Sequence, residues 1–221
     1  MLSQLHKIPA RTDYVEAVYK ALLDAISDGS LPPKTRITQE EIAEQMNISR
    51  LPVLQALRML KNDGFVEDAP GRGLQVTALN IEWIDKLYEV RGALDSLAAK
   101  LAAQKKCVID PQLIKHGRAV SEKGDVSALI DADIAFHSAI YDASENPLIA
   151  KSAHLHWVHL RRVMGAVLQS SQRSAIWDEH QAIADAIKNG DEKKAAELSE
   201  LHANRARKNL IHQLEQTLST N

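Results

Sequence analysis

The 221-residue sequence predicts a mainly α-helical globular protein with two domains, over residues 1–78 and 79–221. Apolar residues recur every three to four positions through most of the chain, which is the period of a helix with one buried face. Glycine and proline gather in the first third, whereas only single ones interrupt the helical patterns after Leu79. The composition, 45% hydrophobic and 25% charged, excludes a disordered or fibrous chain.

The first expected helix covers residues 13–27 and ends at Asp28 and Gly29. A turn at Leu31–Pro33 separates it from Thr38–Glu41, whose S/T-x-x-E spacing is typical of a capping box at the start of a short helix. The residues expected on the buried face of this short helix are Ile42, Ala43 and Met46. Asn47 is expected to end it.

A third helix is expected from Ser49, which can cap its first turn, to Asp63 and Gly64. Two short strands, at residues 65–67 and 74–77, then flank the Gly-rich hairpin tip Ala69–Gly73. The order helix, short helix, tight turn, helix and hairpin predicts a winged helix-turn-helix with a small two-stranded wing. In such a domain the third helix enters the major groove of double-stranded DNA.

Local charge supports contact with DNA, although the net charge of the chain is only −2. The stretch from Ile48 to Asn62 carries Arg50, Arg58 and Lys61 and no acidic residue. Arg50 can reach a guanine edge or a phosphate, and Ser49 with the nearby amide groups suits a phosphate.

The tip of the predicted wing supplies two further candidates for contact with DNA. Arg72 and Gly73 lie in the hairpin, where a side chain can meet either the DNA backbone or the minor groove.

The second domain is expected to be an antiparallel all-α bundle of about six helices. Their expected ranges are 81–105, 111–121, 126–143, 148–169, 175–189 and 192–217. Asp133 and His137 are four positions apart and therefore share one helix face, which is otherwise apolar. His180 and His202 also lie on the apolar stripes of their helices.

Three imidazoles and one carboxylate inside a helical bundle are costly unless they are paired. A divalent transition metal such as Zn, Mn or Ni would satisfy all four side chains. The spacing leaves a second interpretation open, in which each histidine makes its own hydrogen bond in the core.

Arg91 lies on the apolar stripe of the first helix of this bundle and needs an anionic partner there. Asp95, four positions later, can supply one. Two interpretations stay open: Arg91 pairs with Asp95, or it faces a ligand cavity.

The first domain resembles the DNA-binding domain of the GntR family of bacterial transcription regulators over nearly all of residues 12–77. The segments that carry the resemblance are Leu31–Lys34, Ile42–Val53, Ala56–Leu60 and Gly64–Val66. Where the family usually reads S-R-T-P-V-R-E-A-L, this chain has Leu51 and Leu54 in place of a threonine and an arginine that typically touch DNA. These departures leave the fold unaffected and bear on the operator sequence.

The second domain resembles the FCD effector-binding domain of the FadR-like branch, from about Ile81 onward. The pattern consists of Asp133–His137, Asn146–Leu148, Glu179–Ile183 and His202. The resemblance implies a metal held by Asp133, His137, His180 and His202. No extra helix is expected between the wing and Ile81, as in the six-helix, VanR-type variant.

The sequence and the resemblance together predict a ligand-responsive transcription regulator and not an enzyme. We expect a homodimer that represses from an inverted-repeat DNA operator and responds to a small carboxylate effector held by the metal and Arg91. Two alternatives are a regulator for which the metal is itself the signal, and a metal-dependent hydrolase with Glu179 as its base.

The expected location is the cytoplasm, with no contact to a membrane. Residues 1–11 lack the apolar segment of an export signal, and no stretch approaches the roughly 18 apolar residues of a membrane span. The single cysteine, Cys107, cannot form a disulfide within the chain.

Overall fold

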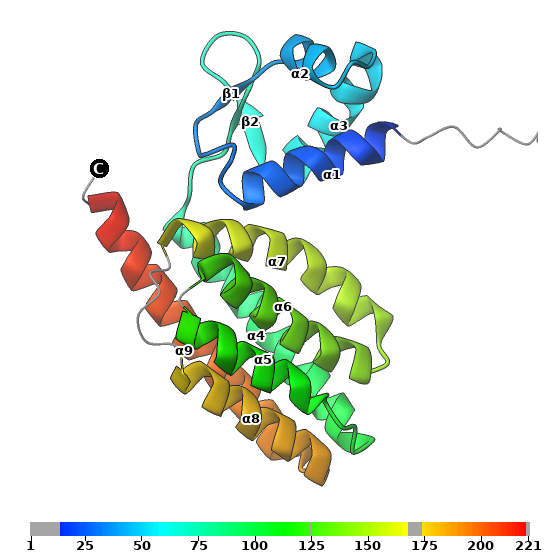
Figure 1. Ribbon diagram of the computed structural model, residues 1–221, viewed down its shortest axis with the longest axis vertical. Helices are drawn as coiled ribbons and strands as arrows, with labels where there is room; N and C mark the ends of the chain where they lie inside the picture. The colour runs from blue at the N-terminus through cyan, green and yellow to red at the C-terminus, as the bar shows by residue number, and fades with distance from the viewer. Residues whose placement is uncertain (1–13, 124, 168–173, 220–221) are drawn as a thin grey trace, which may run out of the picture. The chain divides into compact units, whose positions relative to one another are not determined.

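The computed structural model describes residues 14–123, 125–167 and 174–219 (Figure 1). The contacts between residues divide the chain into two compact units. The first runs to Thr77 without residues 27–30, and the second contains those four residues and the chain from Ala78 onward. The predicted mainly helical fold is confirmed. Residue 13, where the first helix was expected to start, and residues 168 and 169, where the fourth helix of the bundle was expected to end, lie outside the described residues.

The first unit combines three helices with a small antiparallel sheet. The helices are α1 (Tyr14–Ser27), α2 (Gln39–Gln45) and α3 (Arg50–Asn62), and the strands are β1 (Arg36–Ile37), β2 (Val66–Asp68) and β3 (Leu74–Val76). The strand order is β1-β3-β2, with Arg36 opposite Gln75 and Val66 opposite Val76. The predicted two-stranded wing is therefore extended by a third strand, β1. That strand is too short to give a hydrophobic pattern.

The ends of α2 follow the sequence signals in part. Thr38 caps the helix by accepting a hydrogen bond from the amide of Glu41 at 3.3 Å, as the capping box predicts. Asn47 adopts a left-handed conformation with φ of 52°, which ends the helix and starts the tight turn. The expected burial of Met46 is wrong, because this residue follows the last helical turn and is 36% exposed.

The start of α3 also departs from one expectation. Ser49 occupies the cap position, but its side chain makes no capping hydrogen bond. Helix α3 packs against α2 and strand β2. Its buried residues are Val53, Ala56, Leu57 and Leu60.

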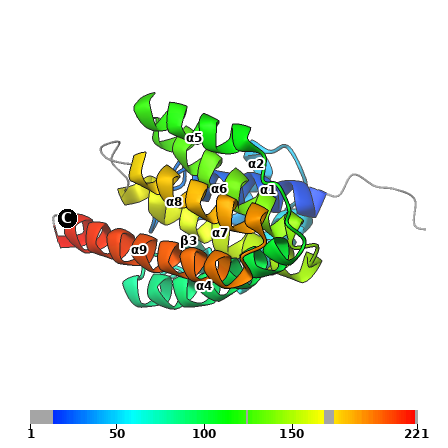
Figure 2. The same ribbon diagram turned by 90° about the horizontal axis from the view of Figure 1, so that it is seen from below.

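The second unit consists of six helices over the described residues. They are α4 (Ile81–Gln104), α5 (Pro111–Lys123), α6 (Val126–Ala143), α7 (Pro147–Val167), α8 (Ser174–Asn189) and α9 (Glu192–Ser219). Asn80 caps α4 by accepting from the Trp83 amide at 2.9 Å, and Asp125 caps α6 in the same way. Helix α6 packs against α4, α5 and α7, while α9 packs along α4 (Figure 2). Residues of α4, α6, α8 and α9 therefore meet inside the bundle.

A close contact between α5 and α8 fixes the position of one buried side chain. A Cβ atom on Gly117 would lie 2.0 Å from the Trp177 ring, so glycine is required where this indole crosses α5. Trp177 is 2% exposed and packs beside His180.

Among the described residues, no helix combines the length and the apolar character that crossing a membrane requires.

Candidate metal centre and DNA-contacting helix

The structure brings Asp133, His137, His180 and His202 together in the bundle. Asp133 and His137 come from α6, His180 from α8 and His202 from α9. One ligand atom from each residue lies within 4.8 Å of all the others. The three histidines are buried, and Asp133 is partly exposed.

The donor atoms of this cluster converge on one point. Nε2 of His180 lies 3.3 Å from Nε2 of His202 and 3.4 Å from Oδ1 of Asp133. Nε2 of His137 is 3.9 Å from the same carboxylate oxygen. Three imidazole nitrogens with one carboxylate oxygen form a donor set that suits a divalent first-row transition metal.

The environment keeps two of these imidazoles neutral. Burial lowers the pKa of His137 well below its ordinary value, and the neighbouring Arg91 guanidinium lowers it further. Burial also lowers the pKa of His180 well below its ordinary value, and the neighbouring His202 lowers it further. A neutral imidazole has the free electron pair that metal coordination requires.

Glu179 orients the third histidine. Its Oε2 atom lies 2.9 Å from Nδ1 of His202, and its Oε1 atom accepts a hydrogen bond from Arg205 at 2.6 Å. The hydrogen bond with His202 lowers the pKa of the Glu179 carboxyl. An Nδ1–H that donates to this carboxylate leaves Nε2 of His202 as the electron-pair donor toward the cluster.

Arg91 lies both beside Asp95 and beside the cluster. Its Nε donates to Oδ2 of Asp95 at 3.2 Å, and its Nη2 lies 3.1 Å from Nε2 of His137. The guanidinium also lies 4.0 Å from the centre of the Trp157 ring. Of the two interpretations of Arg91, the structure shows the pairing with Asp95, and it places the same guanidinium against His137.

Asp95 has a second buried partner. The Tyr141 hydroxyl donates to Oδ1 of Asp95, and the Trp157 indole donates to the same hydroxyl at 3.1 Å. Both Arg91 and Asp95 are 2% exposed. These buried, hydrogen-bonded side chains therefore support the cluster from the side of α4.

Aromatic rings surround the imidazoles on the remaining sides. Phe136 stacks on His180 with centroids 4.1 Å apart, and Trp177 meets the edge of the same ring at 4.7 Å. Trp157 lies 5.1 Å from His137. These rings hold the histidines in place and limit the access of water.

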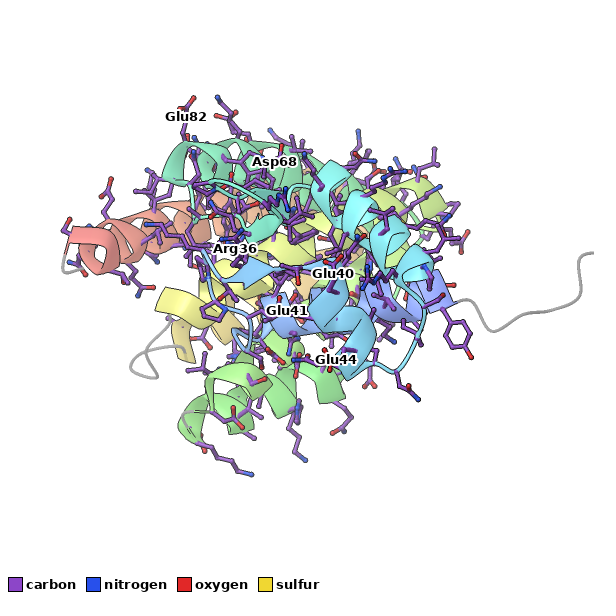
Figure 3. All side chains as sticks on the ribbon, turned by 90° about the horizontal axis from the view of Figure 1, so that it is seen from above. Arg36, Glu40, Glu41, Glu44, Asp68 and Glu82 are labelled. Atoms are coloured by element: carbon purple, nitrogen blue, oxygen red, sulfur yellow. The ribbon has the colours of Figure 1, made fainter. Side chains whose placement is uncertain are left out.

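All five residues predicted to contact DNA are exposed: Ser49, Arg50, Arg58, Arg72 and Gly73. Arg50 begins α3, and its Nη1 lies 3.4 Å from Oε1 of Glu40 on α2. Figure 3 labels Glu40 with two further exposed carboxylates of α2, Glu41 and Glu44. The positive end of α3 is therefore bordered by an acidic helix.

The wing brings a residue that the sequence did not single out next to Arg72. Arg36, labelled in Figure 3, lies on β1 and donates from Nη2 to the Arg72 carbonyl. Gly73 has φ of 93°, and a Cβ there would approach the Ile37 carbonyl oxygen at 3.1 Å. The wing tip thus carries two exposed guanidinium groups.

Two family models match the chain. The model described as bacterial regulatory proteins, gntR family, matches residues 14–76, and the FCD domain model matches residues 86–205. The chain belongs to the family of proteins with an FCD domain, and it carries a gntR-family domain before it. The GntR domain contains α1–α3 with the sheet, and the FCD match covers most of the helical unit with all four cluster residues.

Similar proteins are transcription regulators. YdhC of Bacillus subtilis, an uncharacterized HTH-type transcriptional regulator, is 24% identical over 95% of this chain and 96% of its own length. LutR of the same organism is 29% identical over 80% of this chain and 92% of its own length. The FCD-containing GntR family and these relatives are not enzymes, which confirms the prediction that this chain is not one.

Solved structures share the fold. McbR/YncC of Escherichia coli superposes with a TM-score of 0.76 at 21% identity, covering 92% of this chain and all of that protein. A GntR regulator from Rhodococcus has a TM-score of 0.74 at 23% identity over 91% of this chain and 99% of its own.

Proposed function

We propose that the chain is a cytoplasmic, homodimeric repressor that binds an inverted-repeat operator and is controlled by a small carboxylate in its FCD domain. The observation that carries this proposal is the convergence of four metal-type ligands with the buried Arg91 at one point. A relative from Paenarthrobacter nicotinovorans, 24% identical over 82% of this chain and 81% of its own length, is named a probable D-xylose utilization operon transcriptional repressor. The six helices α4–α9 support assignment to the VanR-type variant.

The metal in this proposal is Zn, Mn or Ni, held by Asp133, His137, His180 and His202. Four protein ligands leave open positions on an ion that accepts five or six, and a carboxylate oxygen is a suitable donor for them. Arg91 would hold the second carboxylate oxygen by a charge-assisted hydrogen bond. The aromatic rings around the histidines limit the space for a long alkyl chain, which favours a small acid.

The proposed function is tested in two steps. Sequencing the genomic DNA fragments that the purified protein retains identifies the operator, and neighbouring genes point to the metabolite. A thermal-shift screen then compares small hydroxy, keto, sugar and amino acids with their amides, with and without chelator. Stabilisation by an acid that its amide lacks, and that chelator abolishes, is the expected result.

Three other results would contradict parts of this proposal. If only neutral compounds stabilise the protein, or if acids act equally in chelator, the effector does not bind as a carboxylate on a metal. If operator binding follows the free metal concentration without any organic acid, the ion itself is the signal. If no specific DNA is retained under any condition, the regulator assignment for this chain fails.

Replacing Arg50 by alanine is expected to weaken specific DNA binding by about 1–3 kcal/mol, because a bidentate contact to guanine would be lost. Arg50→Lys is the matched control, since lysine keeps the charge but not the planar pair of donors. Titration of operator and random DNA measures both variants. Unchanged operator affinity in folded Arg50→Ala would remove Arg50 from the interface, and full rescue by lysine would assign it to a phosphate.

Replacing Arg72 by alanine is expected to lower affinity for all DNA sequences alike. A side chain that contacts phosphate contributes to counterion release, so the slope of log K against log salt should fall by about one unit. Binding titrations at several salt concentrations measure this slope. A selective loss for operator DNA would instead make Arg72 a reader of bases.

Replacing Glu179 by glutamine is expected to weaken metal binding about 10- to 100-fold, because the neutral amide supports the His202 imidazole less well than the carboxylate does. Glu200→Gln, an exposed position on the same helix as His202, is the matched control. Competition with a metal-binding dye measures both affinities. Equal affinities in wild type and Glu179→Gln would show that the His202–Glu179 contact does not tune the centre.

A further inference from the structure

The outer face of α4 carries three large apolar side chains that remain exposed. Trp83 is 42%, Val90 50% and Leu97 44% exposed. They are separated by seven positions each, which is about two helical turns, so they form one stripe along the helix. Figure 2 shows α4 along an outer edge of the helical unit, beside α9.

The seven-residue spacing indicates that a second helix would cover this stripe. Apolar residues repeating every seven positions form a straight seam when a second helix packs at a shallow crossing angle. Exposed apolar stripes of this kind mark sites of protein association. Ala93 borders the stripe, and Gly92 and Ala93 line a groove of about 580 Å³ between α4 and α9. These small residues allow the backbone of another helix to approach.

The stripe is symmetric about its middle member. Under a two-fold axis through Val90, an antiparallel copy of α4 places its Leu97 opposite Trp83 and its Val90 opposite Val90. Such a self-complementary patch is the requirement for an isologous dimer interface. A different protein would not need this symmetry.

Charged residues beside the stripe favour the same arrangement. Glu82 and Lys100 lie on the same flank of α4, about 12 Å before and about 15 Å after Val90 at 1.5 Å per residue. An antiparallel copy therefore brings Lys100 to nearly the same height as the partner's Glu82, twice in the dimer. Within the described part of the chain, Glu82 pairs with Lys86 at 2.5 Å, whereas no ion pair involves Lys100.

We propose that the Trp83–Val90–Leu97 stripe is the dimer interface of this protein, formed by two antiparallel α4 helices around a two-fold axis at Val90. This inference rests on the proposed homodimer and adds the surface, the orientation and the residue on the axis. The buried Arg91 and Asp95 lie on the same helix, so the interface and the candidate metal centre share one rigid element.

Sedimentation velocity of the full chain tests the surface. Val90→Glu places two carboxylates on the axis and is expected to weaken dimerisation by about 100-fold. Val108→Glu is the matched control, because Val108 is also exposed, at 66%, but follows α4 and lies outside the stripe. Circular dichroism shows that each variant is folded. A monomeric wild type would overturn the homodimer itself, whereas a wild-type dimer that persists in Val90→Glu would overturn only this interface.

Cysteine cross-linking in a Cys107→Ala background tests the orientation. In the antiparallel arrangement, Val90→Cys alone forms a cross-linked dimer under mild oxidation, whereas Trp83→Cys and Leu97→Cys cross-link only when mixed. In a parallel arrangement each of the three single variants would cross-link with itself. The parallel pattern, or no cross-link from any variant, would contradict the two-fold axis at Val90.

Discussion

The Asp95→Ala variant is expected to lose about 3–5 kcal/mol of unfolding free energy, the largest effect on stability among the substitutions considered. The substitution leaves the Arg91 guanidinium buried without its carboxylate, and it removes the acceptor of the Tyr141 hydroxyl. Urea unfolding of the metal-free protein, followed by circular dichroism, measures the loss. Metal-free conditions keep ligand binding out of the comparison.

Asp131→Ala is the matched control for this experiment. Asp131 also pairs with an arginine, Arg161, but its side chain is 56% exposed. Surface ion pairs contribute about 0–1 kcal/mol, so this variant should unfold close to wild type. Equal destabilisation of the two variants would mean that the Arg91–Asp95 pair is not the buried element that supports the centre.

The second large effect concerns the metal. Wild-type protein purified without chelator should contain about one equivalent of Zn, Mn or Ni per chain, and His180→Ala should contain none. Because the ligands come from three helices, bound metal should also raise the melting temperature of wild type but not of the variant. Elemental analysis and thermal unfolding with and without chelator measure the two quantities.

His116→Ala provides the control, since His116 is exposed on α5 and does not belong to the cluster of four ligands. This variant should retain both the metal and the metal-dependent rise in melting temperature. A wild type that binds none of the three ions after dialysis against each would defeat the proposed site. Full metal content in His180→Ala would remove that residue from it.

Much of the fold could be predicted because each helix carries a long apolar stripe that has only one way to be buried. The grouping of the four cluster residues was predictable for the same reason, since each lies on such a stripe. Their approach to within 4.8 Å, however, depends on how α6, α8 and α9 cross. Helical periodicity predicts on which face of its helix a residue lies. It does not predict which residues of a neighbouring helix lie opposite that residue.

The features that the sequence did not reveal depend on tertiary contacts. Glu179 lies on a different face of α8 from His180. Its contact with His202 exists only because α9 packs against α8. Strand β1 exists because β3 offers its free edge to Arg36 and Ile37. Met46 has the right spacing for burial, but the helix ends before it. In the first two cases the partner comes from a distant part of the chain, whereas the exposure of Met46 follows from where its own helix ends.

The packing of two tryptophans against the histidines gives the centre an optical property. Trp157 lies 5.1 Å from the His137 ring and Trp177 lies 4.7 Å from the His180 ring. Both indoles are buried, so their emission reports on the surroundings of these imidazoles more than on solvent. A paramagnetic ion such as Mn or Ni at the centre quenches such emission, whereas Zn has a filled d shell and does not quench by this route. Native fluorescence thus distinguishes Zn from Mn and Ni without any label.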